Sequence, residues 1–243
     1  MGLECSIFVH PTICRMAKRC PGRFCILKPM ITQFFILGSS LPYGVGASHA
    51  GWGDLIKQYL HAKMYGEDGV GQKYEVFNFG KADAKIEFVQ ATFPGQLADY
   101  GRKQKTVVVI AIGGNNSKAE GSPDGYISTP QKYVQEMEDL LTMLAKYSDA
   151  VIVVDNGYVD ESKTNPKLNP LTGAASYYSN TRRQQFGDIT ERICKRQEID
   201  FVRLAIDQQE WVENYIYKDG VHPNQQGHQL VFEAIKPYLD KHL

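Results

Sequence analysis

The chain has 243 residues, of which 43% are hydrophobic, so one sizeable core and a single α/β domain are the simplest organisation. Lys and Arg number 27 and Asp and Glu number 27, which argues against a broad basic face for nucleic acid. No run of about 18 apolar residues is present, so the sequence predicts no membrane span, and we expect a soluble, cytoplasmic protein.

Residues 1–32 are expected to form a weakly ordered N-terminal extension, and residues 33–243 the folded domain. Four of the five cysteines lie in the extension, at irregular spacings that fit no paired zinc motif. The segment lacks a continuous apolar stretch and a clear cleavage site, so it makes a poor secretory signal. Gly2 and Ser6 fit the loose myristoylation pattern, which matches often by chance.

From residue 34 onward, apolar runs typical of buried strands alternate with helical patterns. This alternation predicts an α/β fold with a mainly parallel sheet that is covered on both faces. Five strands are expected, at residues 34–38, 74–80, 106–114, 150–156 and 199–204.

Three helices carry clear signals between and after these strands. Thr129 and Pro130 have the residue types of an N-cap followed by proline at the first helical position. Apolar residues then recur at helical spacing, and similar patterns predict a helix around Ile189 and Ile193 and a last helix at the C-terminus. The apolar positions of the first and last of these helices are Tyr133, Met137, Leu140, Leu141 and Leu144, and Leu230, Val231, Ala234, Ile235 and Tyr238.

Residues 156–180 are too many and too polar for a minimal connection between the fourth strand and the next helix. Connections of this length within a domain are usually functional or disordered.

Polar and small residues follow the first three strands. Ser39 and Ser40 follow the first strand, Asn78 and Gly80 lie at the end of the second, and residues 113–116 (Gly-Gly-Asn-Asn) follow the third. Because ligands bind at the carboxyl ends of the strands in an open parallel sheet, we expect these residues to meet at one edge.

A serine becomes a nucleophile when a histidine accepts its proton and a carboxylate orients that histidine. Asp219 precedes His222 by three residues in "DGVHP". In a loop that turns into a helix, this spacing can bring the carboxylate to one ring nitrogen while the other ring nitrogen faces the first strand.

Four short blocks of this sequence resemble those of the SGNH/GDSL hydrolase family. They are "ILGSSLPYGVG", "VFNFG", "IGGNN" and "DGVHP", and they occur in the family's order across residues 34–243. The resemblance implies a three-layer α/β/α, flavodoxin-like fold with a five-stranded, mainly parallel sheet. Each block is short, but four in order at predicted strand ends are specific.

The resemblance implies a role for each matching residue. Ser40 falls on the nucleophile, with His222 as the base and Asp219 as the orienting carboxylate. The oxyanion hole would consist of the backbone N–H groups of Ser40 and Gly80 and the side-chain amide of Asn115.

The sequence departs from the family pattern at two positions. Ser39 stands where the family has an aspartate before the nucleophile, and Asn116 stands where the third block usually ends in aspartate. Neither position belongs to the triad.

Some of these residues also fit simpler interpretations. Serines are common where strands end, so Ser39 and Ser40 alone would predict only a turn. The glycines at 44, 46 and 51 have the spacing GxGxxxxG, which differs from a dinucleotide-binding loop. His228 is expected at the protein surface, and Asp83 is expected to be a loop or cap residue.

The expected function is a serine esterase that cleaves carboxylic esters, with small or short acyl chains favoured, through an acyl-enzyme. Two alternatives stay open: a ligand-binding protein that has lost turnover, and an acyltransferase with the same triad. The ester partner is a small molecule, either a lipid or an acylated sugar, and Tyr158, Tyr177 and Tyr178 are candidates for the pocket walls. No metal or organic cofactor is implied.

Overall fold

The computed structural model describes residues 31–66, 72–170 and 172–243. The predicted N-terminal extension, with its four cysteines and the pattern at Gly2, lies outside the described residues apart from residues 31 and 32. These two residues begin the first strand.

The core of the fold is a five-stranded sheet in which every neighbouring pair of strands is parallel. Its strands are β1 (Ile31–Gly38), β2 (Lys73–Asn78), β3 (Lys105–Ala111), β5 (Ala150–Val154) and β8 (Asp200–Val202). Their order is β2-β1-β3-β5-β8. The five predicted strands are confirmed, with ends that differ by a few residues.

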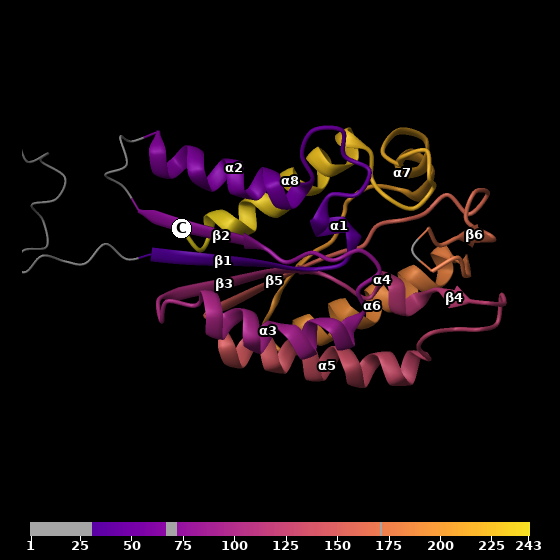
Figure 1. The fold of residues 1–243 in the computed structure, drawn as a ribbon, viewed down its shortest axis with the longest axis horizontal. Helices are drawn as coiled ribbons and strands as arrows, with labels where there is room; N and C mark the ends of the chain where they lie inside the picture. Colours follow the sequence, from indigo (N-terminus) through magenta and orange to yellow (C-terminus); the bar gives the residue numbers. More distant parts are fainter. Residues whose placement is uncertain (1–30, 67–71, 171) are drawn as a thin grey trace, which may run out of the picture.

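Helices cover both faces of this sheet (Figure 1). On one face lie α3 (Ile86–Tyr100), α5 (Pro130–Tyr147) and α6 (Asn180–Arg196), and on the other lie α2 (Trp52–Tyr65), α7 (Gln208–Asn214) and α8 (Gln225–Asp240). Phe35 and Leu37 belong to the core on the first face, whereas Phe34 and Ile36 belong to the core on the second. This alternation follows from the two-residue period of a strand, and it confirms the three-layer α/β/α fold.

Helix α5 begins where the sequence predicted. The Thr129 side chain accepts a hydrogen bond from the backbone N–H of Lys132, and Pro130 is the first helical residue. The predicted apolar positions from Tyr133 to Leu144 are buried. The predicted helices around Ile189 and at the C-terminus are also confirmed, as α6 and α8.

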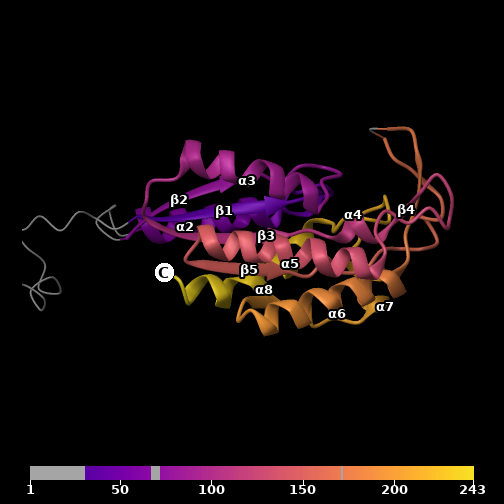
Figure 2. The same ribbon diagram turned by 90° about the horizontal axis from the view of Figure 1, so that it is seen from below.

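The long connection after β5 contains two short strands. These strands, β6 (Lys167–Leu168) and β7 (Ala175–Tyr177), join β4 (Ala119–Glu120) in a three-stranded antiparallel sheet with the order β4-β7-β6. Figure 2 shows this part of the chain beyond the carboxyl ends of the main strands. The described residues of this connection therefore form regular structure at the edge where a ligand is expected.

The order of the strands determines which of the following segments are neighbours at the carboxyl edge of the sheet. Because β1 lies between β2 and β3, the segments that follow these three strands are neighbours. The short helices α1 (Ser40–Tyr43) and α4 (Gly114–Ser117) follow β1 and β3. Among the described residues, no helix is long and apolar enough to cross a membrane.

Candidate active site

The turn after β1 places the two adjacent serines, Ser39 and Ser40, in different surroundings. Gly38 has a φ of 130°, and a Cβ at this position would lie 2.0 Å from the carbonyl oxygen of Ala111, so only glycine fits. Ser39 is buried, and its backbone N–H donates to the same carbonyl oxygen at 3.2 Å. Ser40 is half-buried and lines a pocket of about 190 Å³.

Ser40, His222 and Asp219 form a continuous chain of contacts. The Oγ atom of Ser40 lies 2.9 Å from Nε2 of His222. Nδ1 of His222 lies 2.5 Å from Oδ2 of Asp219. The structure thus brings together a hydroxyl, an imidazole and a carboxylate from chain positions 182 residues apart.

The loop between α7 and α8 holds Asp219 in place. Oδ1 of Asp219 accepts the backbone N–H groups of Val221 at 2.9 Å and His222 at 3.0 Å. Burial alone would raise the pKa of Asp219, but the hydrogen bond and charge of His222, together with the two N–H groups, hold this pKa well below its usual range. Asp219 is therefore a carboxylate whenever the imidazole can act as a base.

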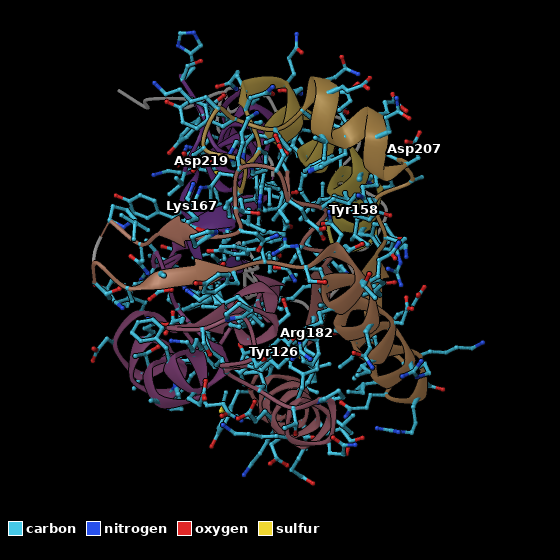
Figure 3. All side chains as sticks on the ribbon, turned by 90° about the vertical axis from the view of Figure 1, so that its right-hand side faces the viewer. Tyr126, Tyr158, Lys167, Arg182, Asp207 and Asp219 are labelled. Atoms are coloured by element: carbon cyan, nitrogen blue, oxygen red, sulfur yellow. The ribbon has the colours of Figure 1, made fainter. Side chains whose placement is uncertain are left out.

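Lys167, from β6, contacts the same aspartate. Its Nζ atom lies 3.6 Å from Oδ2 of Asp219 and also donates a hydrogen bond to the backbone carbonyl oxygen of that residue. Figure 3 shows Lys167 and Asp219 as neighbours, with Tyr158 standing apart from them. No sequence motif indicates Lys167; the only signal is the length of the connection that carries it.

We expect Lys167→Met to lower kcat/KM by roughly fivefold, because it removes the charged donor that bonds the backbone carbonyl oxygen of Asp219 and helps to hold this residue in place. The measurement is kcat/KM at pH 7.5, with Lys167→Arg as the matched control that keeps the charge. An unchanged kcat/KM in Lys167→Met would contradict this expectation.

Of the expected oxyanion donors, Asn115 lies at the pocket and Gly80 does not. Asn115 lines the pocket, and its Nδ2 atom donates to the carbonyl oxygen of Ala84 at 2.9 Å, which leaves its second hydrogen for a ligand. Gly80 is not one of the residues that line the pocket, and its N–H donates to Oδ1 of Asn78 at 3.0 Å. This geometry disfavours Gly80 as an oxyanion donor, because its only hydrogen already has an acceptor.

Asp83 occupies the position at the pocket that was expected for Gly80. It lines the pocket, has a φ of 61°, and its backbone N–H has no acceptor among the described residues. A left-handed backbone conformation is uncommon for a residue other than glycine and often marks a functional site. Asp83 is a loop residue, as its sequence context predicted, and it also lines the pocket.

Asn116 and Ser39, the two residues that depart from the family pattern, are both buried. Asn116 is fully buried, where its Oδ1 accepts the N–H of Ile86 at 3.3 Å and its Nδ2 lies 3.4 Å from Oγ of Ser128. Ser39 is 4% exposed. Neither Ser39 nor Asn116 is among the residues that line the pocket.

The three tyrosines suggested as pocket walls fall in different places. Tyr178 lines the pocket. Tyr177 and Tyr158 are not among its lining residues. Tyr177 alternates with the pocket-lining Ser176 along β7, and Tyr158 packs beside the core that contains Trp211, whose Nε1 donates to its carbonyl oxygen at 3.0 Å.

His228 is buried, which corrects the expectation that it lies at the surface. Its exposed fraction is 0%. Nδ1 accepts the backbone N–H of Trp52 at 3.3 Å, so the ring proton lies on Nε2, which donates to the carbonyl oxygen of Val45 at 3.1 Å. The ring thus connects α8 to Val45 and Trp52, at the two ends of residues 45–52, a role that its spacing in the sequence did not indicate.

Acidification should destabilise the fold through His228. Burial lowers the pKa of His228, although its hydrogen bond to Val45 acts in the opposite direction. Between the lowered folded value and the unfolded value of about 6.5, only the unfolded chain binds the proton, so stability falls as the pH drops below roughly 6.5. Urea unfolding should show that the free energy of unfolding falls less between pH 7.5 and pH 5.5 in His228→Gln than in the original chain. Equal falls in the two proteins would contradict this effect of His228.

The structure brings a serine, a histidine and an aspartate into contact at the carboxyl edge of a three-layer α/β fold, which is the residue set of serine hydrolases. The family model described as GDSL-like lipase/acylhydrolase family matches residues 36–230. This match spans most of the chain, so the protein belongs to the GDSL-like lipase/acylhydrolase family and is a carboxylic ester hydrolase.

Solved structures share the fold at low sequence identity. A lipase/acylhydrolase from Enterococcus faecalis is 15% identical, with a TM-score of 0.63, over 87% of this chain and 97% of that chain. An acetylxylan esterase from Geobacillus stearothermophilus is 17% identical, with a TM-score of 0.60, over 85% and 92%. An enzyme from the metagenome of Lake Arreo, Spain, is 17% identical, with a TM-score of 0.59, over 86% and 94%. No curated protein sequence matches the chain.

Proposed function

We propose that this protein hydrolyses small carboxylic esters through an acyl-enzyme on Ser40. The observation that carries the proposal is the 2.9 Å contact between Oγ of Ser40 and Nε2 of His222, whose other nitrogen is held by Asp219. A hydroxyl in contact with an oriented imidazole is the arrangement that activates a serine.

The reaction has two steps. His222 accepts the proton of Ser40 as Oγ attacks the ester carbonyl carbon, and Asp219 stabilises the imidazolium that forms. His222 then gives this proton to the leaving alcohol, and the acyl group stays on Ser40. In the second step His222 takes a proton from water, the water oxygen attacks the acyl carbon, and the proton returns to Ser40 as the acid leaves.

Three N–H donors are placed to stabilise the tetrahedral oxyanion. They are the backbone N–H of Ser40, the free hydrogen of the Asn115 amide and the backbone N–H of Asp83, the last in place of the expected Gly80. Ser40 begins α1, where no preceding helical turn supplies an acceptor for its N–H. Ser40, Asp83 and Asn115 line the same pocket.

Asn115→Ala should lower kcat by about a hundredfold to a thousandfold, because it removes one oxyanion donor. KM should change much less, since the donor acts mainly on the charge that develops in the transition state. Steady-state kinetics on 4-nitrophenyl acetate is the measurement. A loss confined to KM would mean that Asn115 binds the substrate without stabilising the oxyanion.

The small pocket favours a short acyl group. Its volume of about 190 Å³ is below the range of roughly 300 to 1,000 Å³ that is usual for drug-sized ligands. The similar fold of an acetylxylan esterase is consistent with an acetyl-sized group. We therefore expect acetate and propionate esters to be cleaved faster than esters of long-chain acids.

Labelling with a fluorophosphonate probe, followed by peptide mapping, tests the proposed function. Covalent modification of Ser40 that is lost in His222→Ala supports an activated serine. No labelling of the folded protein would favour a binding protein without turnover. If labelling occurs and an added alcohol acceptor is acylated faster than water, the protein is an acyltransferase.

A further inference from the structure

One face of the small sheet β4-β7-β6 covers the pocket. Ser176 of β7 is directly paired with Glu120 of β4 on one side and with Lys167 of β6 on the other. Side chains of directly paired residues project from the same face of a sheet. Because Ser176 and Lys167 both line the pocket, this face is turned toward Ser40 and His222.

Ser176 places an unsatisfied hydroxyl in this wall. The residue is 1% exposed, and its Oγ has no hydrogen-bond partner among the described residues. A buried hydroxyl without a partner is destabilising, and most buried polar groups in proteins are paired. The missing partner is therefore expected to come from a ligand.

Asp83 lines the same pocket, and one of its two carboxylate oxygens is unpartnered among the described residues. Its Oδ1 lies 2.7 Å from Nζ of Lys118, and its Oδ2 makes no hydrogen bond within the described part of the chain. Lys118 is 1% exposed and also lies 2.8 Å from Oε1 of Glu120. A buried ammonium is costly unless it is paired, so this lysine holds both carboxylates in place.

The loop that carries Asp83 is held rigidly against α4. The Asn115 amide donates to the carbonyl oxygen of Ala84, and the N–H of Ile86 donates to Asn116. The free carboxylate oxygen of Asp83 is thus fixed in position before any substrate arrives.

We propose that Asp83 and Ser176 form a hydroxyl-binding subsite, so that the preferred substrates are small esters that carry a free hydroxyl near the ester group. Oδ2 of Asp83 accepts a hydrogen bond from the substrate hydroxyl, and Oγ of Ser176 supplies a second hydrogen bond to its oxygen. This inference rests on the proposed function. It concerns which esters are favoured, not whether esters are cleaved.

Isosteric ester pairs provide the test. One pair is 2-hydroxyethyl acetate and propyl acetate, and the other is ethyl glycolate and ethyl propionate, so that in each pair a hydroxyl replaces a methyl group. The ratio of kcat/KM within each pair is divided by the ratio of the alkaline hydrolysis rates, which removes intrinsic reactivity. We expect a preference for the hydroxylated ester of at least about tenfold in one pair. The pair that shows it tells whether the hydroxyl lies on the alcohol or the acyl side.

Ser176→Ala is the principal variant. It should lower the hydroxyl preference by about threefold or more, while the melting temperature stays the same or rises, since the variant removes an unpaired buried hydroxyl. Ser148→Ala is the matched control, because Oγ of Ser148 is already bonded to the carbonyl oxygen of Leu144, and the residue lies at the opposite end of the sheet. The control should keep the preference.

Asp83→Asn is the second variant, and asparagine tolerates the left-handed conformation. It should reduce the preference by about tenfold, because a charged acceptor is replaced by a neutral amide. Absence of any hydroxyl preference in the original chain, or the same preference in Ser176→Ala and Ser148→Ala, would overturn the subsite. Failure to cleave any of the four esters, together with no labelling of Ser40, would instead overturn the proposed function.

Discussion

Ser40→Ala should lower kcat by about four to six orders of magnitude, because no other hydroxyl is placed in contact with Nε2 of His222 within the described residues. Residual turnover would come from the oxyanion donors and substrate binding alone. The KM should stay within a few-fold of its original value, since Ser40 Oγ acts in the chemical step. The measurement is kcat and KM for ester hydrolysis, with enough enzyme to detect slow turnover.

Ser39→Ala is the matched control for this variant. Ser39 is buried, it does not line the pocket, and its hydrogen bonds within the described residues are made through the backbone. We expect kcat to change by less than about tenfold. Comparable losses from the two alanine variants would mean that the nucleophile has been placed on the wrong serine.

Asp219→Asn should lower kcat by about ten-thousandfold while leaving the fold intact. In the original chain Oδ1 of Asp219 accepts two backbone N–H groups, and Oδ2 faces Nδ1 of His222. An asparagine oxygen would keep the backbone bonds, so its NH₂ group would face Nδ1. That arrangement places the imidazole proton on Nε2, which then cannot accept the proton of Ser40.

Nitrogen NMR chemical shifts of His222 give a readout of this tautomer that is independent of activity. Asp207→Asn is the matched control, because Asp207 also accepts a backbone N–H, from Glu210 at 3.0 Å, but caps α7 instead of contacting a histidine. Asparagine caps helices about as well as aspartate, so this control should keep both stability and activity. If Asp219→Asn retains more than about a tenth of the original kcat, the orienting role of Asp219 is wrong.

The sequence by itself was sufficient to predict the scaffold and the three residues, Ser40, His222 and Asp219, that the structure brings into contact. Apolar runs of strand length and the cap at Thr129 predicted the strands and α5, because these patterns depend on residues that are close together in the chain. Asp219 and His222 were also found by local spacing. The position of Ser40 after β1 indicated the edge of the sheet at which all three residues meet.

The surroundings of that centre were decided only by the tertiary structure. The N–H of Gly80 is taken by Asn78, whereas Asp83 turns left-handed into the pocket, and no spacing in the sequence distinguishes these two outcomes. Lys167 and Ser176 lie on the neighbouring strands β6 and β7, and β7 pairs with the distant strand β4. His228 is buried by contacts with Val45 and Trp52. Local patterns encode local conformation, but burial and hydrogen-bond partners depend on which distant segments pack together, and that is settled only when the chain has folded.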